Sequence, residues 1–442
     1  MKVAASPPGA RPAILSARSS SLSEPRDRFE PSRHASSSER MRNAPVWWVA
    51  GPEVPAVPGR EGSILNSNRI LKRDQYPGVH QSALQGSGQP PIPGAPNYRN
   101  PHETTLHGLG QPTIQGLRAV LAASGAGPGG SGGPALWINL REEPVIYIDG
   151  QPLCLRDRRF PLGNLTATSI SGRNLEEIEE NLRQEVLAEA ERNHGRIALH
   201  DESADGRLTQ RELLLDPERV QTPRQIFDSL RSEGYRVSYH RVPISDEKAP
   251  EPQDFDELVR LLKDQPPETP RIFNCQAGRG RTTTGMVIAD LVDQARTGRL
   301  APVLEALAVR PLLQEHFEDA TGGKYTSLQD VARSLSDDPV SHQAADRAID
   351  RFDHLQNLRR AVLDRAPDSG PYGSPEEATR ARGRDFLERY FLLVRFAQYL
   401  AEQSPNGYAQ PFTAWVAQQP GLYNSLELLE KAVNLWHSAF AA

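Results

Sequence analysis

Apolar and polar positions follow two different spacings between residues 111 and 297. Short apolar runs predict buried strands, and longer segments with an apolar residue every three or four positions predict amphipathic helices. Strands that alternate with helices predict an α/β fold, with a mostly parallel central sheet and helices on its faces. The predicted strands are 136–140, a hairpin at 145–156, 196–200, 235–242 and 271–275, and the predicted helices are 111–124, 173–193, 222–234, 254–264 and 281–297.

The hydrophobic pattern changes after residue 300. Helical spacing continues and the strand patterns stop, which predicts an all-helical C-terminal subdomain that packs against the sheet as a scaffold. The segments with this spacing are 300–317, 327–335, 342–366 and 380–403. We therefore expect three regions, which are a tail at 1–45, a sheet-containing domain at 46–300 and a helical subdomain at 301–442.

Residues 1–45 are rich in Ser, Pro, Ala and Arg and have almost no apolar periodicity. Such a segment buries too little apolar surface to offset the entropy of ordering, so we predict a disordered tail. It also lacks the apolar core of a secretory signal peptide. Three interpretations stay open: an export signal of the type III kind, an organellar transit peptide, and a disordered tail with no targeting role.

Composition narrows the functional classes. The chain has 442 residues, a net charge of −5 and two cysteines, Cys154 and Cys275. This charge does not favour binding of the whole protein to nucleic acid or to a membrane surface, so any cationic site is local. No run of 18 apolar residues exists, and no transmembrane helix is predicted. Two cysteines cannot by themselves form a disulfide scaffold or a structural zinc site.

The stretch RIFNCQAGRGRTTTGM, residues 271–286, carries the clearest candidate chemistry. A strand is expected to end at Asn274 and a helix to begin near Arg281, so the turn after Cys275 lies at a helix N-terminus. Its N–H groups and the helix dipole would converge on one oxyanion. The residues of this predicted phosphate cradle are Gln276, Ala277, Gly278, Arg279 and Gly280.

Three side chains around this turn fit covalent phosphate chemistry. Arg281 offers a fork of donors for two phosphate oxygens. The same positive field favours the thiolate form of Cys275, which can attack phosphorus and form a cysteinyl-phosphate. Thr282 can hydrogen-bond the sulfur and help it leave in a second step. A buried cysteine beside a surface arginine would be the alternative, but it does not explain two glycines and two arginines in one turn.

Such chemistry also needs a general acid for the leaving oxygen. Asp246 is the best candidate because it follows a predicted strand, in a proline-bounded loop that could close over the site. A solvated loop aspartate is the alternative interpretation. Asp254 and Asp256 are weaker candidates, since they resemble the N-cap and first turn of the next helix.

With these residues in view, the chain resembles a known family. CQAGRGRT carries the signature of cysteine-based protein tyrosine phosphatases, and the segments LKRDQYPGVH, GAPNYR, WINLREEPVIYIDGQPLCLR and ERYFLLVRFAQYLAEQ extend the resemblance to phosphatase-like phytases and paladins over residues 70 to 418. The resemblance implies a sheet-and-helix phosphatase fold, no metal or other cofactor, and stepwise dephosphorylation of inositol polyphosphates. A single unit with a Ser- and Arg-rich head is similar to type III effector phytases of plant pathogens, which would act in the cytoplasm of a host cell.

Charge around the site bears on the substrate class. An inositol polyphosphate brings many negative charges, so additional cations near the turn are favoured. The candidates are Arg279, Lys248 and Arg241, joined by Lys72, Arg73 and Arg99, which only the family resemblance brings to the site. Phosphoinositide lipids would also fit, but no basic amphipathic helix or lipidation signal is visible. We therefore expect a small-molecule substrate, with no nucleic-acid partner and no membrane insertion.

One position departs from the family pattern. Most active members have His before the cysteine, and this chain has Asn274. That difference leaves two alternatives to a phytase open, a protein tyrosine phosphatase and a catalytically inactive module that binds phosphorylated ligands.

For two further features we favour a structural interpretation over a functional one. DESADGRLTQRE, residues 201–212, fits the ligand spacing of an EF-hand calcium loop, but a strand precedes it, so a hairpin is expected instead. Cys154 could form a reversible redox pair with Cys275, although a lone cysteine in a strand is more often a small core residue.

Overall fold

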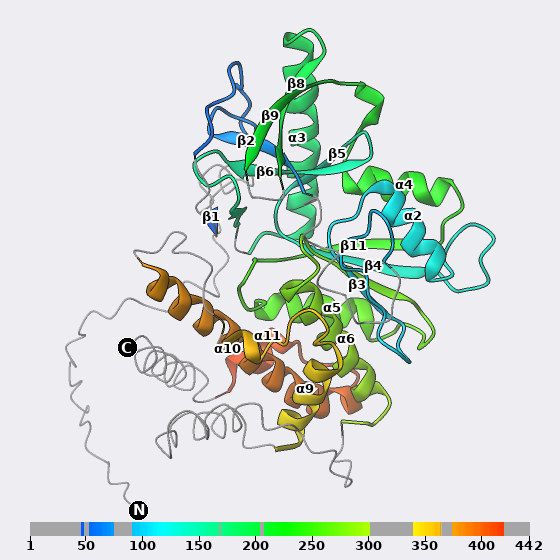
Figure 1. Ribbon diagram of the computed structural model, residues 1–442. Coiled ribbons are helices and arrows are strands. Elements are labelled where there is room, and N and C mark those ends of the chain that lie inside the picture. The colour runs from blue at the N-terminus through cyan, green and yellow to red at the C-terminus, as the bar shows by residue number, and fades with distance from the viewer. Residues whose placement is uncertain are drawn as a thin grey trace, which may run out of the picture. The chain divides into compact units, whose positions relative to one another are not determined.

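A computed structural model of the chain describes residues 46–47, 53–74, 91–167, 169–203, 207–300, 339–362, 364 and 374–419 (Figure 1). The predicted tail at 1–45 and the helical spacing predicted within residues 301–338 lie outside the described residues. No helix among the described residues is long and apolar enough to cross a membrane.

A four-stranded parallel sheet forms the centre of the fold, as the pattern predicts. Its strand order is β11 (Val237–Ile244), β4 (Ala135–Arg141), β12 (Arg271–Asn274) and β3 (Leu106–Leu109). All neighbouring pairs are parallel. The strands therefore end at one common edge, and the loops that follow β4, β11 and β12 gather there.

Helices cover both faces of this sheet (Figure 1). Side chains of β4 alternate between the faces: Leu136 and Ile138 belong to one apolar core and Trp137 to another. The first core contains residues of α5 (Pro252–Leu262) and α6 (Gly280–Arg296), and the second contains residues of α2 (Ile114–Ala123) and α4 (Pro223–Ser232). The fold class predicted from the sequence is thus confirmed.

A second sheet of six strands was not evident from the sequence. Its order is β10 (Val220–Gln221), β5 (Val145–Ile148), β6 (Gln151–Asp157), β2 (Arg69–Arg73), β8 (Arg196–Glu202) and β9 (Leu208–Leu214). Its apolar face packs on α3 (Gly172–Arg192), whose Leu175, Ile178 and Leu182 are fully buried. A short pair of β1 (Val46–Trp47) and β7 (Asn164–Leu165) completes the described strands.

Both predicted hairpins are present in this second sheet. β5 and β6 pair antiparallel, and Asp149 and Gly150 at their turn have positive φ angles of 52° and 74°. Positive φ at both turn residues is the geometry that Asp-Gly favours in two-residue hairpins. β8 and β9 also pair antiparallel, so residues 201–212 lie largely in a hairpin rather than between two helices, which excludes the EF-hand arrangement.

Three C-terminal helices share the first core with α5 and α6. They are α9 (Pro339–Arg351), α10 (Pro375–Gln403) and α11 (Phe412–Ala417). The helical spacing predicted through 342–366 is wrong over the described residues 352–359, where the chain turns before a 3-10 turn at Arg360–Val362. Just before this turn, the side-chain oxygen of Asn357 accepts the backbone N–H groups of residues 359 and 360 in place of a helical carbonyl.

Candidate active site

Cys275 lies at the floor of a loop between β12 and α6. We call residues 275–281 the phosphate loop. The Sγ atom accepts a hydrogen bond from the N–H of Gly278 at 3.3 Å and lies 3.2 Å from Oγ1 of Thr282, and the residue is 3 % exposed. The Thr282 hydroxyl carries one hydrogen and also lies 3.2 Å from the carbonyl oxygen of Leu109, so it donates to either the sulfur or that oxygen. The sulfur thus lies at the N-terminus of α6.

Glycines give this loop its shape. Gly278 has a φ of +74°, and a Cβ atom there would lie 2.4 Å from the backbone nitrogen of Gly110. A Cβ on Gly110 would in turn lie 2.7 Å from the carbonyl oxygen of Gln276. The N–H of Gln111 donates to that same carbonyl at 2.7 Å. The segment after β3 therefore supports the phosphate loop by direct backbone contact, which only glycine permits.

Arg99 and Asn97 hold the loop from behind. Arg99 donates to the carbonyl of Gly278 at 2.6 Å and to Oγ1 of Thr283 at 3.0 Å, and Asn97 donates to the carbonyl of Ala277 at 2.8 Å. Burial lowers the pKa of Arg99 to about 10, and the nearby Cys275 opposes the shift. Arg99, predicted to bind substrate, thus contacts the back of the loop, and Asn97 was missed although it lies two residues before it.

Arg281 is a buried cation with two carboxylate partners. Its Nη1 lies 2.9 Å from Glu143, its Nε lies 3.1 Å from Asp246, and it also donates to the carbonyl of Ile244 at 3.2 Å. Burial acts to lower the pKa of Arg281, but the charges of Asp246, Glu143 and Cys275 raise it overall. The guanidinium is therefore permanently charged and fixed beside the sulfur.

Asp246 reaches this guanidinium from a loop after β11. We call residues 245–250 the acid loop. Besides the ion pair with Arg281, Asp246 accepts a hydrogen bond from the Asn164 side chain. Burial acts to raise the pKa of Asp246, but the charge of Arg281 and the Asn164 hydrogen bond outweigh it and lower the pKa. Asp246 and Arg281 are therefore an ion pair in this structure.

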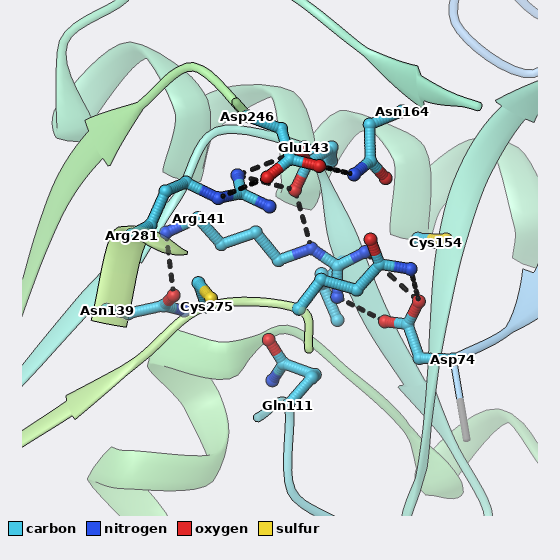
Figure 2. A network of polar contacts seen from close by, with 12 residues as sticks. Asp74, Gln111, Asn139, Arg141, Glu143, Cys154, Asn164, Asp246, Cys275 and Arg281 are labelled. Atoms are coloured by element: carbon cyan, nitrogen blue, oxygen red, sulfur yellow. Dashed lines mark hydrogen bonds and ion pairs between the residues drawn. The ribbon is translucent and has the colours of Figure 1, made fainter. Parts of the chain in front are cut away.

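A charge network that the sequence analysis missed supports Arg281 (Figure 2). Glu143 lies between the guanidinium groups of Arg141 and Arg281, and accepts from Arg141 at 2.8 Å. Arg141 also pairs with Asp74, at the end of β2. All four side chains are almost fully buried, so each charge depends on its partner. The sequence feature that could have indicated this network is the charged triplet Arg141 to Glu143 at the end of a buried strand.

Asn274 is part of a buried amide cluster beneath the loop. Its Oδ1 accepts from the indole N–H of Trp137 at 2.8 Å, and its Nδ2 donates to Asn139 at 3.2 Å and to Gln111 at 3.3 Å. The residue is 1 % exposed. Both ends of the amide are therefore satisfied, and the residue that replaces the usual histidine still orients the strand end before Cys275.

The remaining predicted cations have different surroundings. Arg241 pairs with Glu179 at 3.0 Å, Lys72 with Glu202 at 2.6 Å, and Arg73 with Asp201 at 2.9 Å. These three side chains therefore have protein carboxylates as partners in this structure. The exposed Arg279 lies on the phosphate loop itself, and the half-buried Lys248 lies on the acid loop.

Cys154 belongs to the second sheet. It is fully buried on β6, and Nε of Arg156 donates to its Sγ at 2.9 Å. Burial raises the pKa of its thiol, which Arg156 only partly opposes. The structure thus places it as a buried residue of the sheet, and both cysteines are free thiols.

Glu142 offers a test of stability against pH. Burial raises its pKa from 4.5 to about 8, with a further contribution from Glu143, while Ser245 donates to it at 2.9 Å. The folded protein then keeps a proton that the unfolded chain releases, so stability falls as pH rises from 4.5 towards 8. We expect Glu142→Gln to raise the Tm by a few degrees at pH 8 and to change it little near pH 5, in thermal melts followed by circular dichroism. A Tm difference that does not vary with pH would contradict this assignment.

A known protein family matches the part of the chain that carries the candidate site. Positions 138–293, from within β4 to within α6, match the PTP-like phytase family model, whose description reads "Inositol hexakisphosphate". Residues 138–293 are therefore similar to the PTP-like phytase family. The resemblance stated from the sequence is thereby confirmed, and the match includes the phosphate loop, the acid loop and Glu143.

Two curated relatives extend the likeness. Paladin of Gallus gallus is 28 % identical over 306 residues, which cover 66 % of this chain and 33 % of paladin. The effector protein hopD2 of Pseudomonas syringae pv. tomato is 26 % identical over 195 residues, covering 43 % of this chain and 37 % of hopD2. The chain thus spans about a third of the length of the curated relatives that it matches.

Two solved structures are similar as well. The tandemly repeated PTP-like phytase of Mitsuokella multacida is 14 % identical with a TM-score of 0.48, over 82 % of this chain and 49 % of that chain. A PTP-like phytase of Bdellovibrio bacteriovorus is 16 % identical with a TM-score of 0.44, over 84 % of this chain and all of that chain.

Proposed function

We propose that this protein is a cysteine-dependent phosphatase that removes phosphate from inositol hexakisphosphate and related inositol polyphosphates. The observation that carries the proposal is the convergence of Cys275, Arg281 and Asp246 at the N-terminus of α6, with two hydrogen-bond donors beside Sγ of Cys275. The family match over the same residues supports the substrate class.

In the first step a substrate phosphate enters the phosphate loop and takes the place of Asp246 on the Arg281 guanidinium. The loop N–H groups and Arg281 bind the non-bridging oxygens and stabilise their charge in the transition state. The Cys275 thiolate attacks phosphorus, a sulfur–phosphorus bond forms, and the bond to the inositol oxygen breaks. Asp246 gives its proton to that leaving oxygen.

In the second step water attacks the cysteinyl-phosphate. Asp246, now ionised, takes a proton from the water, a phosphorus–oxygen bond forms, and the sulfur–phosphorus bond breaks. The Thr282 hydroxyl, 3.2 Å from the sulfur, donates to the thiolate as it leaves. Inorganic phosphate is released and the enzyme returns to its starting state.

The ionisation of Asp246 makes a kinetic prediction. Its pKa is lowered in the free protein, but a bound phosphate removes the Arg281 contact and adds negative charge, which raises it. A general acid must be protonated, so we expect the fall in kcat at high pH to lie at a higher pH than the fall in kcat/KM. Asp246→Asn should lower kcat by about 10²-fold or more and remove the fall at high pH. The measurement is the pH profile of kcat and kcat/KM for the wild-type protein and for Asp246→Asn. An unchanged fall at high pH in Asp246→Asn would contradict the role of Asp246 as general acid.

The test of the function is phosphate release from inositol hexakisphosphate compared with a phosphotyrosine peptide, with Cys275→Ser as the control. Release from the inositol substrate that depends on Cys275, with slow turnover of the peptide, supports the proposal. Faster turnover of the peptide would instead identify a protein tyrosine phosphatase. Tight binding of the inositol substrate without release from either substrate would identify an inactive binding module.

We further propose that the protein is a bacterial effector that a type III system exports into the cytoplasm of a host cell. The similarity to the effector protein hopD2 supports this proposal. A translocation reporter fused to the full chain should give a signal in host cells only when the type III system is intact. An equal signal from a strain that lacks the secretion system would overturn it.

A further inference from the structure

The acid loop is tied to the C-terminal helix α10. Nε of Arg389 donates to the carbonyl oxygen of Lys248 at 3.1 Å, and Nη2 of the same guanidinium donates to the same oxygen. About two turns earlier along the helix, Nε of Arg382 donates to Glu247 at 2.9 Å. The acid loop is therefore held by two arginines that lie more than 100 residues away in the sequence.

Arg389 also meets the phosphate loop. Its side chain is fully buried, and its guanidinium stacks on the Phe386 ring at 4.6 Å. Its third nitrogen, Nη1, has no hydrogen-bond acceptor among the described residues and lies against Gly280, where a Cβ atom would be 2.9 Å away. A single rigid guanidinium thus touches both loops of the proposed active site.

The charge of Arg389 acts on the proposed acid. Burial lowers the pKa of Arg389 to about 10, and Glu247 and Asp246 act in the opposite direction, so the group is charged at neutral pH. Its charge is in turn among those that lower the pKa of Asp246. Among the described residues, one donor of this fully buried cation has no acceptor, which is unfavourable for stability and calls for a functional explanation.

We propose that Arg389 is a positioning residue that keeps the acid loop over the phosphate loop while substrate is bound. The inference rests on the proposed phosphatase function. When a phosphate binds Arg281, it displaces Asp246, which loses its ion pair to the phosphate loop. The hydrogen bond from Arg389 to the Lys248 carbonyl remains. Asp246 then stays within reach of the leaving oxygen.

The test compares two substrates that differ in their need for a general acid. Arg389→Ala should lower kcat about tenfold to a hundredfold for inositol hexakisphosphate and less than about threefold for dinitrophenyl phosphate, whose leaving group needs no proton. KM should change little. Loss of a nearby positive charge should also move the fall in kcat/KM to higher pH. Arg389→Lys, which keeps the charge but not the fork, should recover the pH profile and only part of kcat.

Gly280→Ala gives an independent probe of the same contact. Its new Cβ would lie 2.9 Å from Nη1 of Arg389 and 3.2 Å from Oε1 of Gln356, so it should displace the guanidinium and reproduce the Arg389→Ala profile. If it acts through Arg389, it should add almost nothing in the Arg389→Ala background. Arg395→Ala is the matched control, since this arginine is on the same helix but donates to Gln398 at 3.0 Å and stacks on Phe391.

The outcomes are distinct. An equal loss on both substrates, or no loss on either, would overturn the positioning role of Arg389. Additive effects of Gly280→Ala and Arg389→Ala would also overturn it. If the wild-type protein releases no phosphate from either substrate, the proposed function itself fails.

Discussion

Cys275→Ser is expected to lower phosphate release from inositol hexakisphosphate by at least about 10⁴-fold, because it removes the proposed nucleophile. A serine hydroxyl is a far weaker acid than a thiol, and the groups beside Sγ are donors rather than bases. Substrate binding should persist, since the loop N–H groups and Arg281 are unchanged. Initial rates and isothermal titration calorimetry measure the two quantities.

The second cysteine supplies the matched control. Cys154→Ser replaces a buried thiol of β6 with a hydroxyl that can still accept from Arg156, so activity should stay within about threefold of wild type. A Cys275→Ser variant that retains turnover would remove the basis of the mechanism. An equal loss in both variants would show that the effect is structural.

Arg281→Lys is expected to lower kcat/KM by about 10³-fold, because a single ammonium cannot bind two phosphate oxygens in the plane of a fork. It should also lower the Tm, since Glu143 is fully buried and would lose a well-placed partner. Steady-state kinetics and thermal melts check the two effects. Arg279→Lys, on the exposed side of the same loop, should lower kcat/KM by less than about tenfold and leave the Tm unchanged. Equal losses of kcat/KM in the two variants would contradict the central role of Arg281.

Much of the fold could be predicted because its signal is local. The helices α3 and α6 and the strand β4 have clear apolar periods, and each was placed within two residues of its observed ends. The second sheet could not be predicted in the same way. Its two hairpins, β5–β6 and β8–β9, were predicted, but β2 lies between them in the sheet and comes from a distant part of the chain, so no local pattern joins them.

The residues of the candidate site were also predicted only where their signal is local. Cys275, Arg281 and Thr282 lie within eight residues at a strand–helix junction, so their spacing alone brings them together. Glu143 and Arg389 come from β4 and α10, and only the tertiary fold brings them to the loops. The same reason explains the cations: Lys72 was chosen for its charge, and the sequence could not show that Glu202 lies opposite it.

For Asn274, the sequence shows a difference from the family but not the consequence of that difference for the site. Its identity departs from the family pattern, and sequence alone could not show whether the loop keeps its shape without histidine. In the structure its amide connects Trp137, Asn139 and Gln111, so the strand end is held by other means. Under the proposed mechanism, catalysis then depends on Cys275 and its loop rather than on a neighbouring imidazole.

The most direct test is to trap the covalent intermediate. Protein mixed with inositol hexakisphosphate and quenched in acid within the first turnover should gain the mass of one phosphoryl group, and peptide mapping should locate it on Cys275. Asp246→Asn should accumulate more of it if breakdown is slowed more than formation. Turnover without any phosphorylated cysteine, or with the phosphoryl group on another residue, would contradict the account.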